Sequence, residues 1–284
     1  MNKIEENIVF NNSNDKNYQI LLNNLLKNIF FDFQFWFDLN LWDDNYESYA
    51  YINNDEIVSN ISVFKTDLVF NQKKYLALSI GSVATKKEFR GKGYSGILMN
   101  HILDEYEGIP MYLSANDSVV DFYPKFGFKR VYEKLPVYKC EVNNNIKPQK
   151  INYDSKKVWN YIYNRINYSQ KLDCLNTSSI NIFHIYLGYL KDYIYEIPEL
   201  NTMIIAIKKE STLKFVGIFS LENISFFELI DYLPFKNINK IEFGFMPYWS
   251  DMNYTMENYK TDPFFVKNID CDLGDFKFPE VSIT

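Results

Sequence analysis

The segment from Arg90 to Ser95, which reads RGKGYS, combines residue types that suit the binding of an anion. Gly91 and Gly93 lack the Cβ atoms that would keep a ligand away from the backbone. Arg90 and Lys92 add two positive charges beside the glycines. This combination predicts a turn that holds a phosphate or a pyrophosphate group.

Two elements must position this turn. Residues 75–80 are largely apolar, are compatible with a β-strand and are numerous enough to cross a sheet. Behind the turn, apolar side chains recur at helical spacing from Ile97 to Tyr106. The glycines therefore lie where a strand passes into a helix. The free N–H groups and the dipole at a helix N-terminus favour a negative charge, which supports the phosphate interpretation.

The same turn resembles a motif of a known family. Residues 90–95 are similar to the R/Q-x-x-G-x-G/A loop with which acyltransferases of the GNAT superfamily bind the pyrophosphate of acetyl-coenzyme A. Ser95 stands where that motif has Gly or Ala. Residues 116–128 resemble the family's N-x-x-A-x-x-x-Y-x-x-x-G-F signature, with Val119 in place of the alanine and Tyr123 at the tyrosine. The two motifs also follow each other in the family's order.

The resemblance, which covers roughly residues 8–140, implies a GNAT acyltransferase fold of the mixed α/β class. It further implies that the strands near Val83 and Met111 diverge and hold the pantetheine arm of the coenzyme between them. Ten residues are expected to contact acetyl-coenzyme A: Val83, Ala84, Thr85, Arg90, Gly91, Lys92, Gly93, Tyr94, Ser95 and Asn116.

The reaction implied by the resemblance is N-acetylation, in which an acetyl group passes directly from acetyl-coenzyme A to a primary amine in a ternary complex. Tyr123 matches the family's general acid, and a phenol with a pKa near 10 is protonated at neutral pH. No carboxylate occurs in residues 76–81, where relatives often place a base. Ser79 could hold a water molecule. In some tandem relatives the terminal carboxylate enters the site, which makes Thr284 a further candidate.

Two other functions stay open. A coenzyme-binding or ligand-sensing module that has lost catalysis would also keep the turn, and the missing base favours it. Residues 91–96 also match G-x-G-x-x-G, the dinucleotide fingerprint of oxidoreductases. That fingerprint needs an acidic residue about 20 positions on, where Leu113, Ser114 and Ala115 stand. We therefore favour the acyltransferase.

An aromatic-rich segment follows the first predicted helix, which covers residues 16–31. Residues 33–42 contain Phe33, Phe35, Trp36, Phe37 and Trp42. In the GNAT superfamily, the helices after the first strand border the acceptor site. We interpret most of these aromatic side chains as core packing. The acceptor is expected to be a small-molecule or peptide amine that the sequence does not identify.

The composition restricts the class of protein. A net charge of −6 and a pI near 5.1 disfavour a basic surface for nucleic acid. Cys140, Cys174 and Cys271 are too few and too scattered for a disulfide framework. His101 and His184 lie far apart, with no pattern of metal ligands. We found no signal peptide, and charges interrupt the most apolar segment, so a cytoplasmic protein with no metal and no membrane contact is expected.

The length of 284 residues predicts one large or two modest domains. A polar segment, residues 141–150, is the predicted linker between a catalytic domain (1–140) and a second domain (151–284). In the first part, strands are expected at 46–52, 57–65, 75–80 and 111–114, and a helix at 118–126. In the second part, helices are expected at 158–166, 180–190 and 227–233, and strands at 202–207, 213–221 and 241–245. This order resembles a second, degenerate GNAT-like domain without either motif, and a different small α+β domain is the alternative. The oligomeric state stays open.

Overall fold

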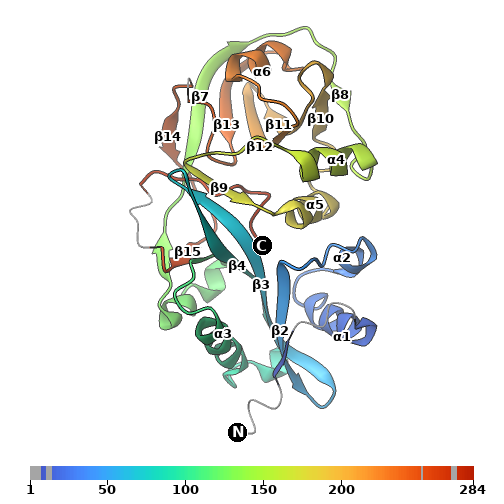
Figure 1. Cartoon of the computed structure of the whole chain (residues 1–284), viewed down its shortest axis with the longest axis vertical. Helices are drawn as coiled ribbons and strands as arrows, with labels where there is room; N and C mark the ends of the chain where they lie inside the picture. Colours follow the sequence, from blue (N-terminus) through green and yellow to red (C-terminus); the bar gives the residue numbers. More distant parts are fainter. Residues whose placement is uncertain (1–7, 11–14, 251, 270–273) are drawn as a thin grey trace.

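The computed structural model describes residues 8–10, 15–250, 252–269 and 274–284. Two mixed β-sheets lie one above the other, with helices packed on them (Figure 1). The end of the chain at Thr284 lies near the middle of the molecule, between the sheets. This arrangement is the mixed α/β class that the sequence predicts.

The first sheet consists of β1 (Ile8–Phe10), β2 (Tyr46–Asn53), β3 (Glu56–Phe70), β4 (Lys73–Thr85), β5 (Met111–Ser114), β6 (Lys129–Val131), β9 (Leu172–Leu175) and β15 (Phe264–Lys267). The second consists of β7 (Lys134–Val142), β8 (Gln149–Lys150), β10 (Ile194–Ile197), β11 (Thr202–Lys209), β12 (Thr212–Ser220), β13 (Ile238–Phe243) and β14 (Thr255–Asn258). The α-helices are α1 (Lys16–Leu26), α2 (Gln34–Asp38), α3 (Tyr94–Glu105), α4 (Lys156–Asn164), α5 (Ser178–Tyr186) and α6 (Phe226–Tyr232). Short 3-10 turns are η2 (Lys87–Phe89), η3 (Asp117–Val119), η4 (Tyr123–Phe126) and η5 (Pro198–Leu200).

Two tight hairpins build the centre of the first sheet, where β2, β3 and β4 pair antiparallel. The first hairpin turns at Asn54 and Asp55, whose φ angles are 49° and 61°. The second turns at Asn71 and Gln72, with φ angles of 46° and 66°. Asn and Asp tolerate this left-handed region better than most residues. The first turn lies between the two strands that the sequence predicts at 46–52 and 57–65.

The second sheet repeats the strand order of the first. The strands β10, β11 and β12 pair antiparallel, and β13 then pairs parallel to β12 after the helix α6. In the first sheet, β2, β3 and β4 precede the helix α3, and β5 pairs parallel to β4. This repeat agrees with the degenerate GNAT-like second half that the sequence suggests.

Each sheet also contains a strand from the other half of the sequence. The strand β15 lies between β5 and β6 in the first sheet, and β7 lies between β13 and β14 in the second. The predicted linker, residues 141–150, begins inside β7 and ends in β8. The domain limits 1–140 and 151–284 stay predictions, since the sheets do not follow the division between them.

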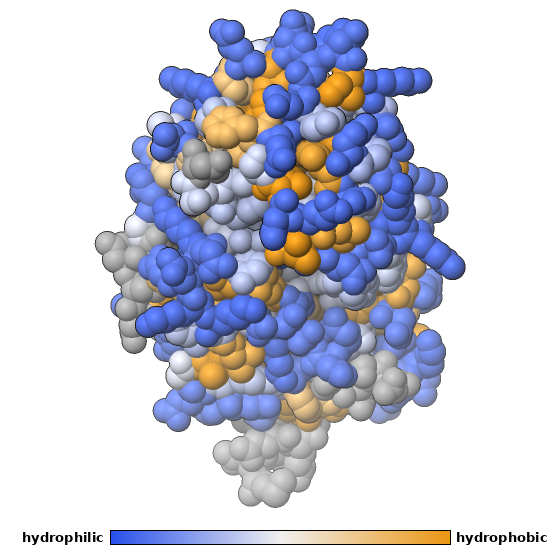
Figure 2. All heavy atoms as spheres, turned by 45° about the horizontal axis from the view of Figure 1, so that its top comes forward, coloured by the Kyte–Doolittle hydropathy of each residue, from blue (hydrophilic) through white to orange (hydrophobic). Residues whose placement is uncertain are grey.

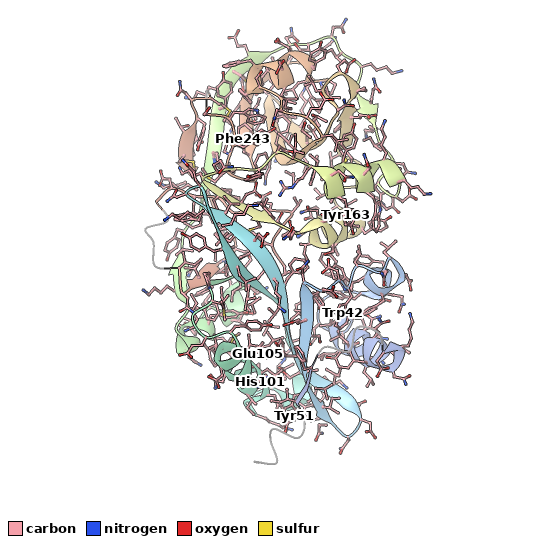
Figure 3. All side chains as sticks on the ribbon, in the orientation of Figure 1. Trp42, Tyr51, His101, Glu105, Tyr163 and Phe243 are labelled. Atoms are coloured by element: carbon pink, nitrogen blue, oxygen red, sulfur yellow. The ribbon has the colours of Figure 1, made fainter. Side chains whose placement is uncertain are left out.

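The hydrophobic core connects the two halves. One cluster of buried side chains joins Leu22 of α1 and Trp36 of α2 to Tyr161 of α4 and Ile185 of α5. Side chains fill the space between sheets and helices, as at Trp42 near α1 and Phe243 in the second sheet (Figure 3). On the face in Figure 2, hydrophilic residues surround separate hydrophobic patches. None of the described helices is long and apolar enough to cross a membrane.

Several predicted elements need correction. The helix predicted at 16–31 ends at Leu26, and Asp32 then accepts hydrogen bonds from the Asn23 side chain and the Gln34 N–H, which turn the chain into α2. The helix predicted at 118–126 is wrong. Two 3-10 turns stand there, because Pro124 begins a new turn and cannot donate to the preceding one.

Candidate active site

One large cavity of about 790 Å³ contains most of the predicted site residues. Its wall includes Ser82 to Thr85 of β4, Arg90 and Ser95 of the glycine turn, and Ala115 to Asn116 after β5. Tyr123 lines it from η4. The wall continues to side chains of α2 and α5, so that both halves of the chain form the cavity.

A β-bulge in β4 shapes the middle of this cavity. Ser62 of β3 pairs with Gly81 and Asn60 pairs with Ala84, which leaves an extra residue on β4. The φ angle of Ser82 in the bulge is 47°. The buried Asn60 side chain donates a hydrogen bond to the Ser82 carbonyl at 3.1 Å. Sequence reasoning missed Asn60, because a single asparagine in a predicted strand carries no local signal for this role.

The strands β4 and β5 stop pairing at Ser79, before the bulge of β4, in agreement with the divergence that the resemblance implies. Their recorded pairing is limited to Leu78 with Met111 and Ser79 with Tyr112, although β4 continues to Thr85. Ser82, Val83 and Ala84 line the cavity after this pairing ends. Backbone groups along this edge of β4 are therefore placed to bind an extended ligand.

The glycine turn has the geometry of an anion site. Gly91 and Gly93 have φ angles of 76° and 87°, and a Cβ atom at either position would meet no protein atom within 4 Å. Gly93 is the N-cap of α3, so the first N–H groups of that helix have no partner within the helix. The Arg90 side chain is exposed and donates to the Thr85 carbonyl at 3.1 Å, which ties the turn to β4.

Not every residue of the turn faces the cavity. Lys92 Nζ lies 4.5 Å from the ring centroid of Phe89, and the Tyr94 ring packs 4.3 Å from that of Tyr51. Thr85 shares a 2.8 Å hydrogen bond with Ser59. Tyr94 therefore anchors α3 to the sheet, and its side chain is not part of the cavity wall.

Tyr123 and Asn116 come from the second predicted motif. Tyr123 is 4% exposed, and burial raises the pKa of its phenol to about 12. It packs against Phe122, Phe128 and Phe265, which fix its ring. Asn116 accepts a hydrogen bond from the Ser118 N–H at 3.0 Å and so caps η3. The phenol thus stays protonated at neutral pH and can act as a donor in the cavity.

The far end of the cavity is aromatic. Its lining side chains here are Phe30, Phe31, Phe33, Trp36, Tyr46 and Phe183. Phe183 comes from α5 in the second half, and its ring lies within 5.8 Å of those of Phe31, Phe33 and Trp36. Sequence reasoning placed the first-half aromatics near the acceptor site but assigned most of them to the core, and it missed Phe183.

The carboxy-terminal segment passes through the space between the halves. The Asn181 side chain donates to the Val281 carbonyl at 2.6 Å, and His184 Nε2 lies 2.8 Å from the Ile283 carbonyl. Further back, the buried Lys277 ammonium pairs with Glu133 at 3.1 Å. These contacts direct Thr284 into the cavity wall.

The lining residues offer no side chain that could serve as a strong base. They include no Asp, Glu or His, and Arg90 is the one charged side chain among them. In the part of the chain that the structure describes, no group of three or more His, Cys, Asp and Glu residues could hold a metal ion. His101 lies exposed on α3, 3.8 Å from Glu105 (Figure 3). Cys271 lies outside the described residues.

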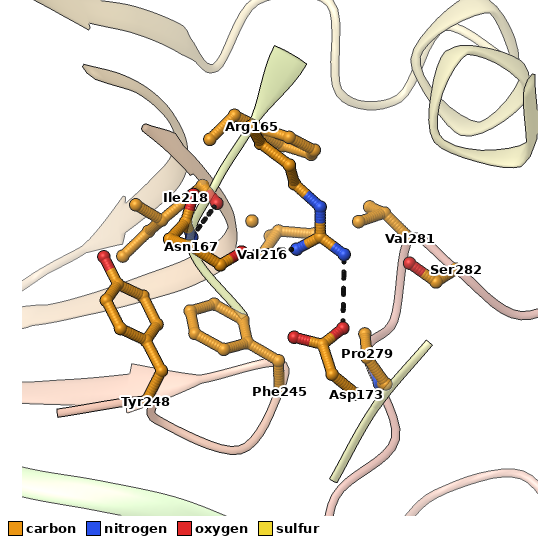
Figure 4. Close-up of a pocket in the computed structure, with 12 residues that line it drawn as sticks. Arg165, Asn167, Asp173, Val216, Ile218, Phe245, Tyr248, Pro279, Val281 and Ser282 are labelled. Carbon is orange, nitrogen blue, oxygen red and sulfur yellow. Dashed lines mark hydrogen bonds and ion pairs between the residues drawn. The ribbon is translucent and has the colours of Figure 1, made fainter. Parts of the chain in front are cut away.

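A second cavity lies beside the second sheet (Figure 4). It measures about 20 Å³ and is lined by polar groups such as Arg165, Asp173 and Tyr248. Arg165 pairs with Asp173 at 3.2 Å. A space of this size holds about one water molecule. It is therefore too small for a substrate.

In the second half, the helix that corresponds to α3 does not offer an anion site. This helix, α6, stands where α3 stands in the first sheet, but Ser225 caps it and Glu228 closes a capping box. The carboxylate of Glu228 thus occupies the first turn, where a phosphate would have to bind.

Comparisons with known proteins agree with this fold. A family model described as an acetyltransferase (GNAT) domain matches residues 14–131. A structure from Enterococcus faecalis V583, described as a conserved protein of unknown function and probable N-acyltransferase, is 15% identical and covers 91% of this chain and 71% of its own, with a TM-score of 0.58. Eis1 from Mycobacterium abscessus is 11% identical, covers 92% of this chain and 72% of its own, and has a TM-score of 0.58.

A GCN5-related N-acetyltransferase from Kribbella flavida is 10% identical, with coverage of 91% and 70% and a TM-score of 0.54. No curated protein matches the sequence. These structural matches extend over both sheets and show the fold. The fold excludes the dinucleotide-binding alternative. That alternative requires a doubly wound, mostly parallel sheet, whereas both sheets of this protein are mixed. Residues 14–131 thus match an acetyltransferase (GNAT) domain, and the chain has the fold of these solved structures.

Proposed function

We propose that this protein transfers an acetyl group from acetyl-coenzyme A to a primary amine, by direct transfer in a ternary complex. One observation carries the proposal. A single cavity joins the bulge of β4, Arg90 and Ser95 of the glycine turn, Tyr123 and a separate aromatic end. Two substrates could therefore enter one space from different sides and meet between Ser82 and Tyr123.

The coenzyme is assigned to the side with the glycine turn. Its pyrophosphate would bind the N–H groups at the start of α3 and the Arg90 guanidinium. Its pantetheine arm would lie along Val83 to Thr85, where β4 no longer pairs with β5. This arrangement places the thioester beside the bulge and within the reach of Tyr123.

In the reaction, the nitrogen of a neutral amine attacks the thioester carbonyl, and a C–N bond forms. The tetrahedral intermediate then breaks its C–S bond, and the departing thiolate accepts the proton of the Tyr123 phenol. The amine nitrogen loses its proton to water held by hydroxyl groups, for which Ser79 and Thr284 are the candidates because they lie together at the bulge. Most of the rate enhancement would come from the positioning of the two substrates.

The test has two steps on the full chain. Calorimetric titration with acetyl-coenzyme A should show binding for wild type and none for Gly93→Asp, since a carboxylate at the start of α3 repels phosphate. Thiol release with a panel of amines should then show turnover in wild type. No binding of acetyl-coenzyme A to wild type would refute the proposal.

A coenzyme-binding module without catalysis is the second candidate, because no carboxylate or imidazole side chain lines the cavity. The same two steps separate the candidates. Tight binding of acetyl-coenzyme A without thiol release, for any amine in a broad panel, would favour the module over the enzyme.

A further inference from the structure

Three hydroxyl groups meet at the bulge of β4, in the wall of the large cavity. They belong to Tyr46 of β2, Ser62 of β3 and Ser82 of β4, and all three residues line the cavity. The Tyr46 and Ser62 hydroxyl oxygens lie 2.6 Å apart. Burial raises the pKa of the Tyr46 phenol, while hydrogen bonds with the Ser62 and Ser82 side chains act in the opposite direction. The phenol is therefore protonated at neutral pH and contacts both serines.

The buried Asn60 side chain sets the direction of the hydrogen bonds among these hydroxyl groups. Its Nδ2 donates to the Ser62 hydroxyl oxygen at 3.0 Å and to the Ser82 carbonyl at 3.1 Å. Its Oδ1 accepts from the Ser48 hydroxyl at 2.7 Å, so both ends of the amide are satisfied. An amide nitrogen can only donate. Ser62 therefore accepts from Asn60, and its own hydrogen has to go to another oxygen.

The three hydroxyl groups carry one hydrogen more than they can use among themselves. Tyr46 bonds to both serines, so the groups form a chain with two links. Two of the hydrogens fill these links, and the last one needs an acceptor outside the chain. When Ser62 and Ser82 both donate to the phenol oxygen, the free hydrogen is that of Tyr46. A buried donor without an acceptor is unfavourable, so this hydrogen is available to a ligand in the cavity.

The negative charge of the proposed reaction forms next to this donor. The proposed function places the thioester carbonyl beside the bulge, and the carbonyl oxygen becomes an oxyanion when the amine attacks. A phenol is a stronger acid than an aliphatic hydroxyl, which makes it the best donor of the three to an anion. The two hydrogen bonds that the phenol accepts polarise it further. Such a preorganised donor stabilises the charge of the transition state.

We propose that Tyr46 is a further catalytic residue, whose hydroxyl group donates a hydrogen bond to the thioester carbonyl oxygen. The inference rests on the proposed function and adds an oxyanion donor to it. When the amine nitrogen forms the C–N bond, the electron pair of the C=O π bond moves to oxygen, which stays hydrogen-bonded to Tyr46 and takes no proton from it. The pair returns as the C–S bond breaks, and the thiolate accepts the proton of Tyr123.

Thr284 supplies the competing acceptor, because it lines the same cavity. Its hydroxyl and N–H groups both bond to Ser79, at 2.6 and 3.3 Å, so its backbone oxygens are the atoms that could take the free hydrogen. A hydrogen bond from Tyr46 to Thr284 would leave the thioester carbonyl unpolarised by Tyr46. The vibrational spectrum of the bound thioester separates the two cases.

The first experiment needs no turnover. Infrared difference spectra of acetyl-coenzyme A, isotopically labelled at its carbonyl carbon, report the stretching frequency of the bound thioester in the absence of an amine. We expect wild type to lower this frequency relative to free acetyl-coenzyme A, because a hydrogen bond weakens the C=O bond. Tyr46→Phe should reverse a measurable part of that shift. An identical frequency in the two proteins would overturn the inference and leave the proposed function intact.

Tyr18 offers a matched control for the kinetics. Its hydroxyl lies 2.7 Å from that of Ser48, and its side chain is 3% exposed, but it does not line the cavity. We expect Tyr46→Phe to lower kcat about 100-fold, the lower range for loss of an oxyanion donor, and to change the Kd of acetyl-coenzyme A less than about twofold. Tyr18→Phe should lose a similar amount of stability and keep kcat within about twofold of wild type. Equal losses of kcat in the two variants would assign the effect to the buried network and contradict the proposal.

Ser62→Ala decides which hydroxyl group supplies the hydrogen. This variant keeps the phenol, so we expect its loss of kcat to be smaller than that of Tyr46→Phe. A larger loss would give the role to Ser62 and overturn the assignment to Tyr46. If wild type binds acetyl-coenzyme A but acetylates no amine, a carbonyl shift that depends on Tyr46 would uphold the hydrogen bond and refute the proposed catalytic function.

Discussion

The hydroxyl group of Thr284 lies 2.6 Å from that of Ser79, 205 positions earlier in the chain. The Thr284 N–H also donates to the Ser79 oxygen at 3.3 Å. Ser79 is fully buried in β4, and its pair with Tyr112 is the last pair between β4 and β5. The contact fixes the end of the carboxy-terminal segment beside the bulge of β4, in the wall of the large cavity.

Gly81→Ala should disturb this contact. A Cβ atom at Gly81 would lie 2.7 Å from Thr284 Cβ, so the segment has to move. Overpacking of this kind costs about 1–3 kcal/mol, and we expect kcat/KM to fall about tenfold while acetyl-coenzyme A affinity is kept. Thiol release and calorimetry measure the two quantities.

A second substitution supplies the control for this prediction. Thr284→Gly removes the Cβ and Oγ1 atoms that the new methyl group would meet, so the activity loss in the double variant Gly81→Ala/Thr284→Gly should be smaller than the sum of the two single losses. Additive losses in the double-mutant cycle would show that the two residues act independently and would contradict the contact.

Tyr123→Phe should lower turnover with little effect on binding. The substitution keeps the ring that packs against Phe122, Phe128 and Phe265 and removes the hydroxyl group to which we assign the proton transfer. We expect kcat to fall about 100-fold, the lower range for loss of a general acid, and the Kd of acetyl-coenzyme A to change less than about twofold. Single-turnover thiol release measures the chemical step. A variant with wild-type kcat would exclude Tyr123 as the acid.

Gly93→Ala should weaken coenzyme binding more than Gly108→Ala, a substitution that causes a similar backbone strain at a distant position. Gly93 and Gly108 have φ angles of 87° and 76°, and a Cβ atom at either would meet no protein atom within 4 Å. Both alanine variants therefore carry the left-handed penalty of about 1–2 kcal/mol. Because Gly93 caps the start of α3, we expect that variant to lose about tenfold in affinity by calorimetry. An equal loss of affinity in Gly108→Ala would show that backbone strain, and not the position at the start of α3, weakens coenzyme binding.

His184 should make stability depend on pH. Burial lowers its pKa below the usual value, although the Ile283 carbonyl and nearby Glu280 act in the opposite direction. Its Nε2–H donates to Ile283, and Nδ1 accepts from the Tyr189 hydroxyl, as a neutral ring requires. In the unfolded chain, His184 takes up a proton near pH 6.5, while in the folded protein it stays neutral. The free energy of unfolding therefore decreases as the pH drops from about 6.5 toward the lowered pKa of the folded state.

His184→Gln keeps an N–H donor for the Ile283 carbonyl and cannot titrate in this range. The difference in Tm between pH 7.5 and pH 5.5 should therefore be smaller in the variant than in wild type. Parallel pH profiles for the two proteins would show that His184 does not contribute to the acid sensitivity.

Local patterns in the sequence predict the part of the fold that local chemistry controls. The Asn-rich turn at Asn54 and the glycine turn before α3 are specified by residues that tolerate positive φ angles, and both lie where expected. The pyrophosphate motif also predicts the cavity wall at Arg90 and Ser95. Prediction worked where one short segment determines its own backbone.

The rest depends on pairing between distant segments. Phe264 to Lys267 form a four-residue strand whose partners are Met111 to Ser114 and Lys129 to Val131. Nothing in its composition indicates those partners, because the hydrogen bonds are between backbones. Phe183 and Thr284 enter the site for the same reason, since their place depends on how the second half packs on the first. Sequence periodicity does not contain that information.

Because β15 lies between β5 and β6, the first sheet can be completed only after nearly the whole chain has been synthesised. When the ribosome has made the first 140 residues, β5 still has an open edge, and it stays open until Phe264 to Lys267 emerge. Such long-range pairing slows folding, and an unpaired edge invites association with other chains. A fragment of the amino-terminal half is therefore expected to aggregate, and the two halves have to mature as one unit.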